Sequence, residues 1–348
     1  MRFASLVLLF ASLGTGAQVT PEALYGRGRQ YADLSVQSFD KLLQTAPESG
    51  YVLALLGEVK SHEHQYTAAI YAYTEATKRM PRLRGVQTGL AEIYQALHKP
   101  EEASAASEAE AQLGQPDCTA ERLYCDYSSG RFEQVVAAAS KKAGPEGLYW
   151  LVRAYNQLSL QTFAQLGELP DSAQLHQVKA QILRDEEQYR ESAEEWRKVL
   201  AFVPDDRNAQ HELATALYLS HDFKATLPEL QQFLKKEPNS ANLNFFVGDS
   251  LLETEGIEQA VPYLETALKL DSKLIPAHAS LGLCYARLGE QKQAIPHLQA
   301  ALALDKDGSL HYQLARAYQA TGQSALAKVM MEKYQQLRKP AAATAPVP

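Results

Sequence analysis

Small residues and bulky apolar residues follow one another in this chain in a unit that repeats every 34 residues. A large apolar residue stands three positions after the first small residue, a second small or short residue twelve positions after it, and a bulky residue sixteen positions after it. The first small residues are Ala180, Ala214, Gly248 and Gly282, and the bulky residues are Trp196, Leu230, Leu264 and Leu298. A fixed period of this length indicates a stack of similar structural units.

The spacing predicts that each unit is a pair of antiparallel helices, in which small residues allow close approach and bulky residues fill the remaining space. We expect the turns at residues 219–223, 254–257 and 288–291, where Gly or polar residues stop the first helix. A proline recurs in three successive units, at Pro228, Pro262 and Pro296. Because proline inside a helix costs about 3 kcal/mol, we expect these residues in the first turn of the second helix, where few N–H groups have helical partners.

The same residue types continue on both sides of the regular units. They are Phe39, Leu42 and Pro47, read as part of a second helix; Gly57, Tyr66, Ala69, Tyr73, Ala76 and Pro81; Ala91, Tyr94, Ala103 and Ser107; and Ala315, Tyr318 and Ala327. The unit resembles the tetratricopeptide repeat, whose signature is Trp/Leu–Gly–Tyr, then Ala–Phe–Ala, then Pro, and the resemblance covers roughly residues 20–338. It implies an all-α fold, a right-handed α-solenoid of antiparallel helix pairs, that binds a peptide or protein in a concave groove lined by first helices.

The repeat pattern, together with the composition of the two ends, predicts five segments along the chain. They are a signal peptide (1–17), N-terminal repeats (18–116), irregular or shortened helical units (117–170), regular C-terminal repeats (171–338) and a disordered Pro/Ala tail (339–348). The irregular segment is too short for ideal units, and we expect a stunted second helix at residues 161–169, before Pro170. Neutral drift in a solenoid explains this irregularity, and so does a change in curvature or a joint between two sub-solenoids.

The N-terminal residues are typical of a secretory signal peptide. Arg2 precedes an apolar run from Phe3 to about Leu13, and Thr15 and Ala17 stand at the −3 and −1 positions for cleavage before Gln18. An uncleaved anchor is the alternative, although the run is shorter than the roughly 20 residues that span a bilayer. We therefore expect export to a bacterial periplasm or cell envelope, or secretion.

Export places the three cysteines in an oxidising compartment. Cys118 and Cys125 can pair if the residues between them form a loop. In a single helix they would be about 10.5 Å apart, too far for a disulfide. Cys284 lies in a helical apolar pattern and is expected to be buried.

Composition and motifs give no sign of catalysis, a cofactor or nucleic acid. The net charge is −7, and the longest basic clusters are pairs such as Lys141-Lys142. The segments His62–Gln65 and His211–Thr215 lack the second histidine that a zinc helix of the H-E-x-x-H type needs. We expect no enzyme activity, no metal and no cofactor.

The periodicity also predicts which residues face the groove. With the first small residue at the seam between the helices, positions six and three before it and one and four after it should face the concave side. In the C-terminal units these positions hold Asn208, His211, Thr215 and Tyr218; Asn242, Phe245, Asp249 and Leu252; and Tyr312, Arg316 and Gln319. Amide, aromatic and single charged side chains suit an extended peptide, and Phe245 is expected to be an exposed aromatic anchor.

The predicted function is therefore a non-catalytic scaffold or adaptor of the bacterial cell envelope. Its partner is a peptide or protein, and lysine is absent from the groove positions, which disfavours an acidic C-terminal motif as the ligand. A self-associating solenoid, hence a homo-oligomer, is the main alternative. An enzyme built on a helical-repeat scaffold is the second alternative, but no convergent polar constellation supports it.

Overall fold

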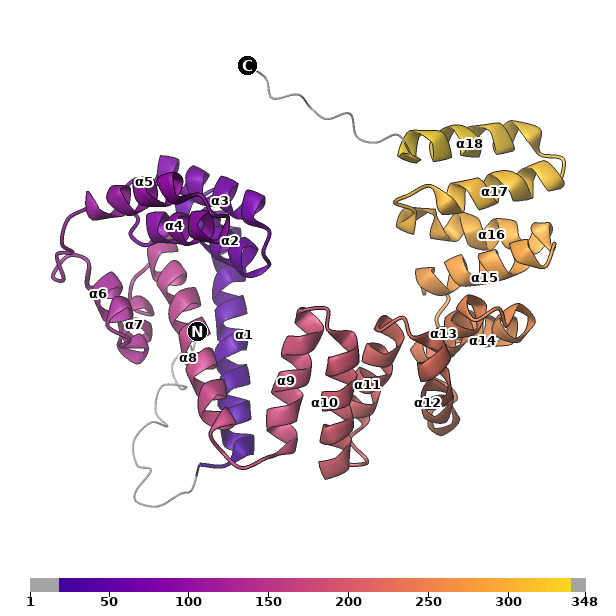
Figure 1. Cartoon of the computed structure of the whole chain (residues 1–348), viewed down its shortest axis with the longest axis horizontal. Coiled ribbons are helices and arrows are strands. Elements are labelled where there is room, and N and C mark those ends of the chain that lie inside the picture. The colour runs from indigo at the N-terminus through magenta and orange to yellow at the C-terminus, as the bar shows by residue number, and fades with distance from the viewer. Residues whose placement is uncertain (1–18, 339–348) are drawn as a thin grey trace, which may run out of the picture. The chain divides into compact units, whose positions relative to one another are not determined.

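The computed structural model describes residues 19–338, so the predicted signal peptide (1–17) and tail (339–348) lie outside the described residues. Every regular element in the described range is a helix, which confirms the all-α prediction (Figure 1). None of these helices is both long enough and apolar enough to cross a membrane. The chain divides into two compact units, Met1–Leu175 and His176–Pro348.

The second unit is a series of helix pairs in chain order, as the 34-residue period predicts. The helices are α9 (Ala173–Asp185, beginning just before the boundary), α10 (Tyr189–Phe202), α11 (Arg207–Leu219), α12 (Phe223–Lys236), α13 (Ala241–Glu253), α14 (Ile257–Leu270), α15 (Ile275–Arg287), α16 (Gln291–Ala301, then a 3₁₀ turn Leu302–Leu304), α17 (Ser309–Ala320) and α18 (Ser324–Arg338). The turns at 219–223, 254–257 and 288–291 are where the pattern places them.

The seam between the two helices of a pair has the predicted register. A Cβ atom added at Gly248 would lie 2.7 Å from Cγ of Leu264, so no larger residue fits there without movement. Gly282 faces Leu298 in the same way in the next pair. The bulky residues of this seam are fully buried: Trp196, Leu230, Leu264 and Leu298.

The placement of the prolines in the first helical turn is wrong. Pro228, Pro262 and Pro296 are each the sixth residue of their helix, so each removes one helical hydrogen bond. All three lie on the exposed side of the helix, and so do the residues four positions earlier. The carbonyl groups that lose a donor can therefore be hydrated, which lowers the cost of an interior proline.

The first unit departs from a simple series of pairs. Its helices are α1 (Pro21–Thr45), α2 (Gly50–His62), α3 (Tyr66–Arg79), α4 (Val86–Ala96), α5 (Pro100–Ala111), α6 (Arg122–Ser128), α7 (Phe132–Ala139) and α8 (Pro145–Gly167). Short helices occur in the irregular segment, since α6 and α7 have seven and eight residues. The expected stunted helix at 161–169 is wrong, because α8 is one helix of 23 residues. Phe39 and Leu42 also belong to a longer helix than expected, since α1 has 25 residues.

The two long helices, α1 and α8, lie side by side although 99 residues separate the end of one from the start of the other (Figure 1). The hydroxyl of Ser35 donates to the carbonyl of Val152 at 3.2 Å, and the hydroxyl of Ser159 donates to the carbonyl of Gly28 at 2.9 Å. Higher residue numbers in α1 meet lower numbers in α8, so the helices are antiparallel. At Gly28 the ring of Phe163 occupies the space of a side chain. The first unit thus joins its first and last helices.

Candidate functional site

The predicted groove residues of α11 and α13 are only partly accessible. Asn208, His211 and Asn242 are exposed, and Thr215, Tyr218 and Asp249 are half-buried. The prediction that Phe245 is exposed is wrong, since 6% of it is accessible, and Leu252 is also buried. The ring of Tyr218 stacks on Phe246 at 4.5 Å and meets the edge of Phe245 at 5.4 Å. Phe245 is therefore part of the packing beneath this face.

The predicted residues of α17 are exposed. Tyr312 is 37% accessible, and its ring lies 5.2 Å from the ring of Tyr334 in α18. The guanidinium of Arg316 lies 5.9 Å from the Tyr312 ring. Gln319 continues the same face toward the end of the helix. These three residues give the end of the second unit a polar, aromatic surface.

The face of α15 lies between these two sets and is apolar. Its four positions of the same spacing, counted from Gly282, hold Pro276, Ala279, Leu283 and Ala286, all half-buried. The spacing rule that predicted the groove residues of α11, α13 and α17 also identifies these four residues when it is counted from Gly282. Their side chains have no polar groups. The first-helix face of the second unit is thus polar toward both ends and apolar at α15.

In the first unit, the corresponding face of α2 is covered by the chain itself. Counted from Gly57, two of the four face positions in α2 are Tyr51 and Glu58. The ring of Tyr51 lies 5.0 Å from the ring of Tyr149 in α8. Nη2 of Arg153, also in α8, lies 3.0 Å from Oε1 of Glu58. Helix α8 therefore occupies the first-helix face of α2. The corresponding face of α4 is open, since three of its four positions are exposed: Thr88, Glu92 and Gln95.

Arg153 is surrounded by rings as well as by Glu58. Its guanidinium lies 4.4 Å from the centre of the Tyr127 ring and donates to the hydroxyl of Tyr149 at 3.1 Å. Burial raises the pKa of Glu58, although the charge of Arg153 acts in the opposite direction. Nε of Arg153 is buried and has no hydrogen-bond partner in the described residues. Packing rather than full polar pairing holds this arginine in place.

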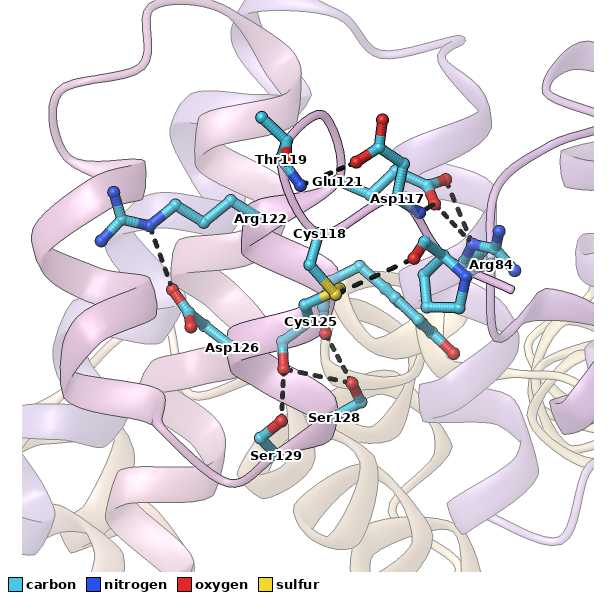
Figure 2. The surroundings of a disulfide bond; sticks show 12 residues. Arg84, Asp117, Cys118, Thr119, Glu121, Arg122, Cys125, Asp126, Ser128 and Ser129 are labelled. Atoms are coloured by element: carbon cyan, nitrogen blue, oxygen red, sulfur yellow. Dashed lines mark hydrogen bonds and ion pairs between the residues drawn. A yellow bond between two sulfur atoms is a disulfide. The ribbon is translucent and has the colours of Figure 1, made fainter. Parts of the chain in front are cut away.

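A disulfide fixes the start of α6 (Figure 2). Cys118 and Cys125 form a disulfide, with their Cα atoms 5.6 Å apart. The residues between them therefore do not form a single helix, and a loop precedes α6. Asp126 follows directly and pairs with Arg131 at 2.7 Å and Arg122 at 3.4 Å. Tyr127 of the same helix lies 5.4 Å from Trp150 of α8. The disulfide thus anchors the helix that packs on α8. Cys284 is buried, as expected.

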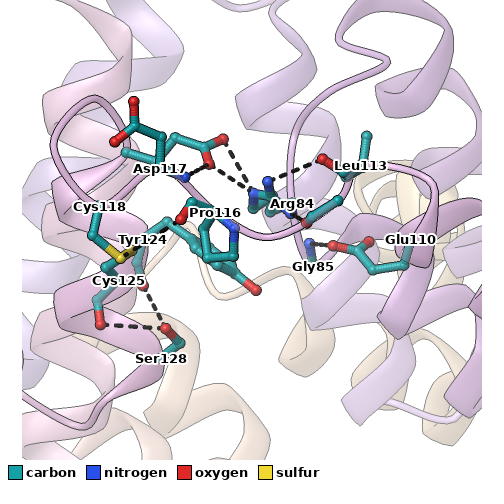
Figure 3. A network of polar contacts seen from close by, with 12 residues as sticks. Arg84, Gly85, Glu110, Leu113, Pro116, Asp117, Cys118, Tyr124, Cys125 and Ser128 are labelled. Carbon is teal, nitrogen blue, oxygen red and sulfur yellow. Dashed lines mark hydrogen bonds and ion pairs between the residues drawn. A yellow bond between two sulfur atoms is a disulfide. The ribbon is translucent and has the colours of Figure 1, made fainter.

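A buried arginine connects the segment before α6 to the segment before α4 (Figure 3). Arg84 donates through Nε to both carboxylate oxygens of Glu121, at 3.0 and 3.1 Å. Its terminal nitrogens donate to the carbonyls of Leu113 and Gly114, at 3.2 and 2.9 Å. A cleft of about 460 Å³ adjoins this network, and its walls include Tyr51, Arg82 and Trp150. Neither the arginine network nor the cleft was predicted, because the contacting residues lie about 30 positions apart in an irregular segment.

The described residues hold no group of three or more His, Cys, Asp or Glu side chains that could bind a metal ion. Residues 275–307 and 308–340 match the family model of the tetratricopeptide repeat. These segments correspond to the helix pairs α15–α16 and α17–α18. The chain therefore contains tetratricopeptide repeats, which confirms the resemblance inferred from its residues.

Comparison with known proteins adds low-level similarities. No curated protein matches the sequence. Among solved structures, MamA protein is 19% identical with a TM-score of 0.41, over 52% of this chain and 100% of that chain. MamA 41-end from Desulfovibrio magneticus RS-1 is 20% identical with a TM-score of 0.43, over 50% and 98%. TTC0263 of Thermus thermophilus, a thermophilic tetratricopeptide repeat protein, is 22% identical with a TM-score of 0.37, over 49% and 93%.

Proposed function

We propose that the protein is a non-catalytic interaction scaffold of the bacterial cell envelope. Its binding surface is the first-helix face of the second unit, formed by α11, α13, α15 and α17, and its partner is a peptide or a protein. The observation that carries this proposal is the contrast between two equivalent positions: α8 covers the face of α2 through Arg153 and Glu58, whereas the face of the second unit retains exposed polar and half-buried apolar residues.

The chemistry of this face suits a protein ligand. The apolar band on α15, with Ala279 and Leu283, offers area for burial, and Asn208 and Asn242 offer amide groups for hydrogen bonds. Apolar contacts beside a few fixed polar groups are the usual composition of a specific interface.

A paired charge insertion tests the proposal. The double variant Ala279→Glu/Ala286→Glu places two carboxylates on the apolar band, and we expect it to fold but to lose the partners that wild type captures from the native envelope. The control is Gln259→Glu/Gln293→Glu, which adds the same charges to exposed positions of the second helices. Equal capture by both variants, with helicity unchanged, would exclude this face as the binding surface.

We also propose that the chain is exported. The arrangement of residues 1–17 supports export, and a disulfide between Cys118 and Cys125 is typical of an oxidising compartment. The mature protein is then expected to begin near Gln18 and to be recovered outside the cytoplasm with both thiols blocked. Recovery from the cytoplasm with Met1 and free thiols would contradict this proposal.

A further inference from the structure

A half-buried carboxylate lies on the first-helix face of the second unit, at Asp249 of α13. Its Oδ2 accepts a hydrogen bond from the hydroxyl of Tyr218 in α11 at 2.9 Å, and its Oδ1 accepts one from the hydroxyl of Ser280 in α15. Three successive first helices thus meet at one acidic group. The two hydroxyl donors fix the orientation of the carboxylate without neutralising it.

This carboxylate has no ion-pair partner among the described residues. Arg287, which follows on α15, donates instead to the carbonyl of Leu252 at 3.4 Å. Charges that are partly removed from water are usually paired, because desolvation disfavours an isolated ion. Each oxygen of an ionised carboxylate can accept two hydrogen bonds, so each oxygen of Asp249 retains one free acceptor site. That pair of sites matches the fork of a guanidinium.

The first unit contains the corresponding contact with its occupant in place. Glu58 directly follows the small residue Gly57, as Asp249 directly follows Gly248. The two carboxylates therefore occupy the same position of the repeat. Glu58 receives the guanidinium of Arg153 at 3.0 Å from α8, a helix that lies on the first-helix face. A second acid at this position of the next repeat, Glu92, is close enough to raise the pKa of Glu58.

We propose that Asp249 binds an arginine or lysine of a helical partner segment, in the way that Glu58 binds Arg153 within the chain. This inference rests on the proposed function and specifies its ligand: an amphipathic helix with one basic residue beside an apolar stripe. The basic side chain lies against Asp249 and the ring of Tyr218, and the apolar stripe covers Ala279 and Leu283 of α15. Aromatic rings next to a cation stabilise such a contact further.

A peptide selection on the full-length protein tests the pairing. A phage-displayed library of amphipathic 18-residue helices, randomised on the apolar face and its borders, is selected on wild type and on Asp249→Lys. Wild type is expected to select peptides with Arg or Lys at one fixed position next to apolar residues. Replacing that basic residue by Gln is expected to weaken binding about tenfold or more. Asp249→Lys is expected to reject these peptides and to bind versions with Glu at the same position.

The controls separate this inference from the proposed function. Glu258→Lys, which makes the same charge change at an exposed residue of α14, should bind the wild-type peptides unchanged. If Asp249→Lys does not fold, Asp249→Asn replaces it, since the amide preserves the shape of the side chain. If the selected peptides lack a fixed basic residue and yet fail to bind Ala279→Glu/Ala286→Glu, that result would overturn the pairing with Asp249 and would leave the proposed function standing. No selected peptide, or peptides that bind that double variant as well as wild type, would overturn both.

Discussion

The guanidinium of Arg153 in α8 lies 3.0 Å from the carboxylate of Glu58 in α2, and this pair links the covering helix to α2. The contact shows how one position of the repeat can be occupied by another helix. In the first unit the chain supplies its own occupant for the face of α2. In the second unit the same position of the repeat carries Asp249, with hydroxyl donors but without a described cation.

Removing the acidic partner of Arg153 should destabilise the first unit. Glu58→Gln leaves the guanidinium charge largely buried without its ion pair, at a cost of about 3 kcal/mol. The double variant Glu58→Gln/Arg153→Met removes the charge as well and should recover part of that loss. Urea unfolding gives the free energies, and hydrogen exchange in α2 and α8 locates the change. Equal stability of the single variant and wild type would show that the pair does not hold α8.

Loss of the disulfide should loosen α6 and then the α8 contact. Cys118→Ser/Cys125→Ser removes a cross-link that closes a short loop, and we expect a loss of about 2 kcal/mol from the free energy of unfolding. The contact between Glu121 of this loop and Arg84 should then be held less firmly. The backbone amides of residues 113–121 should therefore exchange their hydrogens faster. Hydrogen exchange with and without reductant measures this effect. Cys284→Ser, at the buried free cysteine, is the control for substituting a cysteine without breaking a disulfide.

The outer face of α18 should limit end-to-end association. In each earlier second helix of the unit, or in the 3₁₀ turn directly after it, the positions one and eight after the small residue hold apolar side chains that are buried or half-buried. They are Ala193 and Leu200, Leu227 and Leu234, Val261 and Leu268, and Ile295 and Leu302. In α18 these positions hold Lys328 and Gln335, both exposed. Polar residues at the stacking positions of a terminal repeat favour solubility of a repeat stack, although α18 also exposes apolar side chains elsewhere: Leu326, Val329 and Leu337.

We expect Lys328→Ile/Gln335→Leu to self-associate at concentrations at which wild type does not. Sedimentation measures the difference. Lys333→Ile/Gln336→Leu, which makes the same change at exposed positions of the same helix, should not associate to the same degree. If the wild-type protein already forms oligomers, and substitutions in α18 dissociate them, the result would instead favour the alternative of a self-associating solenoid.

A histidine pair between α15 and α16 should make the second unit sensitive to acid. Nδ1 of His278 lies 2.9 Å from Nδ1 of His297, and burial together with the nearby His278 lowers the pKa of His297 below its ordinary 6.5. The unfolded chain therefore binds this proton at higher pH than the folded chain, so stability rises with pH in that window. Stability should be greatest above pH 6.5 and fall as the pH drops below it.

The variant His297→Gln should lose that part of the pH dependence. Thermal unfolding between pH 5 and about 8 compares it with wild type, over the range in which histidine titrates. His62→Gln, at an exposed histidine of the first unit, is the control. An unchanged slope in His297→Gln would exclude this pair as the source.

The regular repeats were predictable because each depends on local periodicity. The small residue at Gly248 and the bulky residue at Leu264 identify the seam wherever they recur, and the structure places them in contact. The same period predicts which positions lie on the first-helix face, but it does not predict that Phe245 is buried. The accessibility of such a position depends on the side chains of the neighbouring helix. Pairing of α1 with α8, and of Glu58 with Arg153, depends on residues about a hundred positions apart and leaves no periodic trace.

Site-specific photo-cross-linking tests the central claim, that the first-helix face of the second unit binds a partner. A photoreactive residue is placed at Ala279 or Ala286 on that face, and at Gln259 or Gln293 on exposed positions of the second helices. Irradiation of native envelopes should give the same cross-linked partner from both face positions and none from the other two. The same partner at all four positions, or cross-links only from Gln259 and Gln293, would contradict the account.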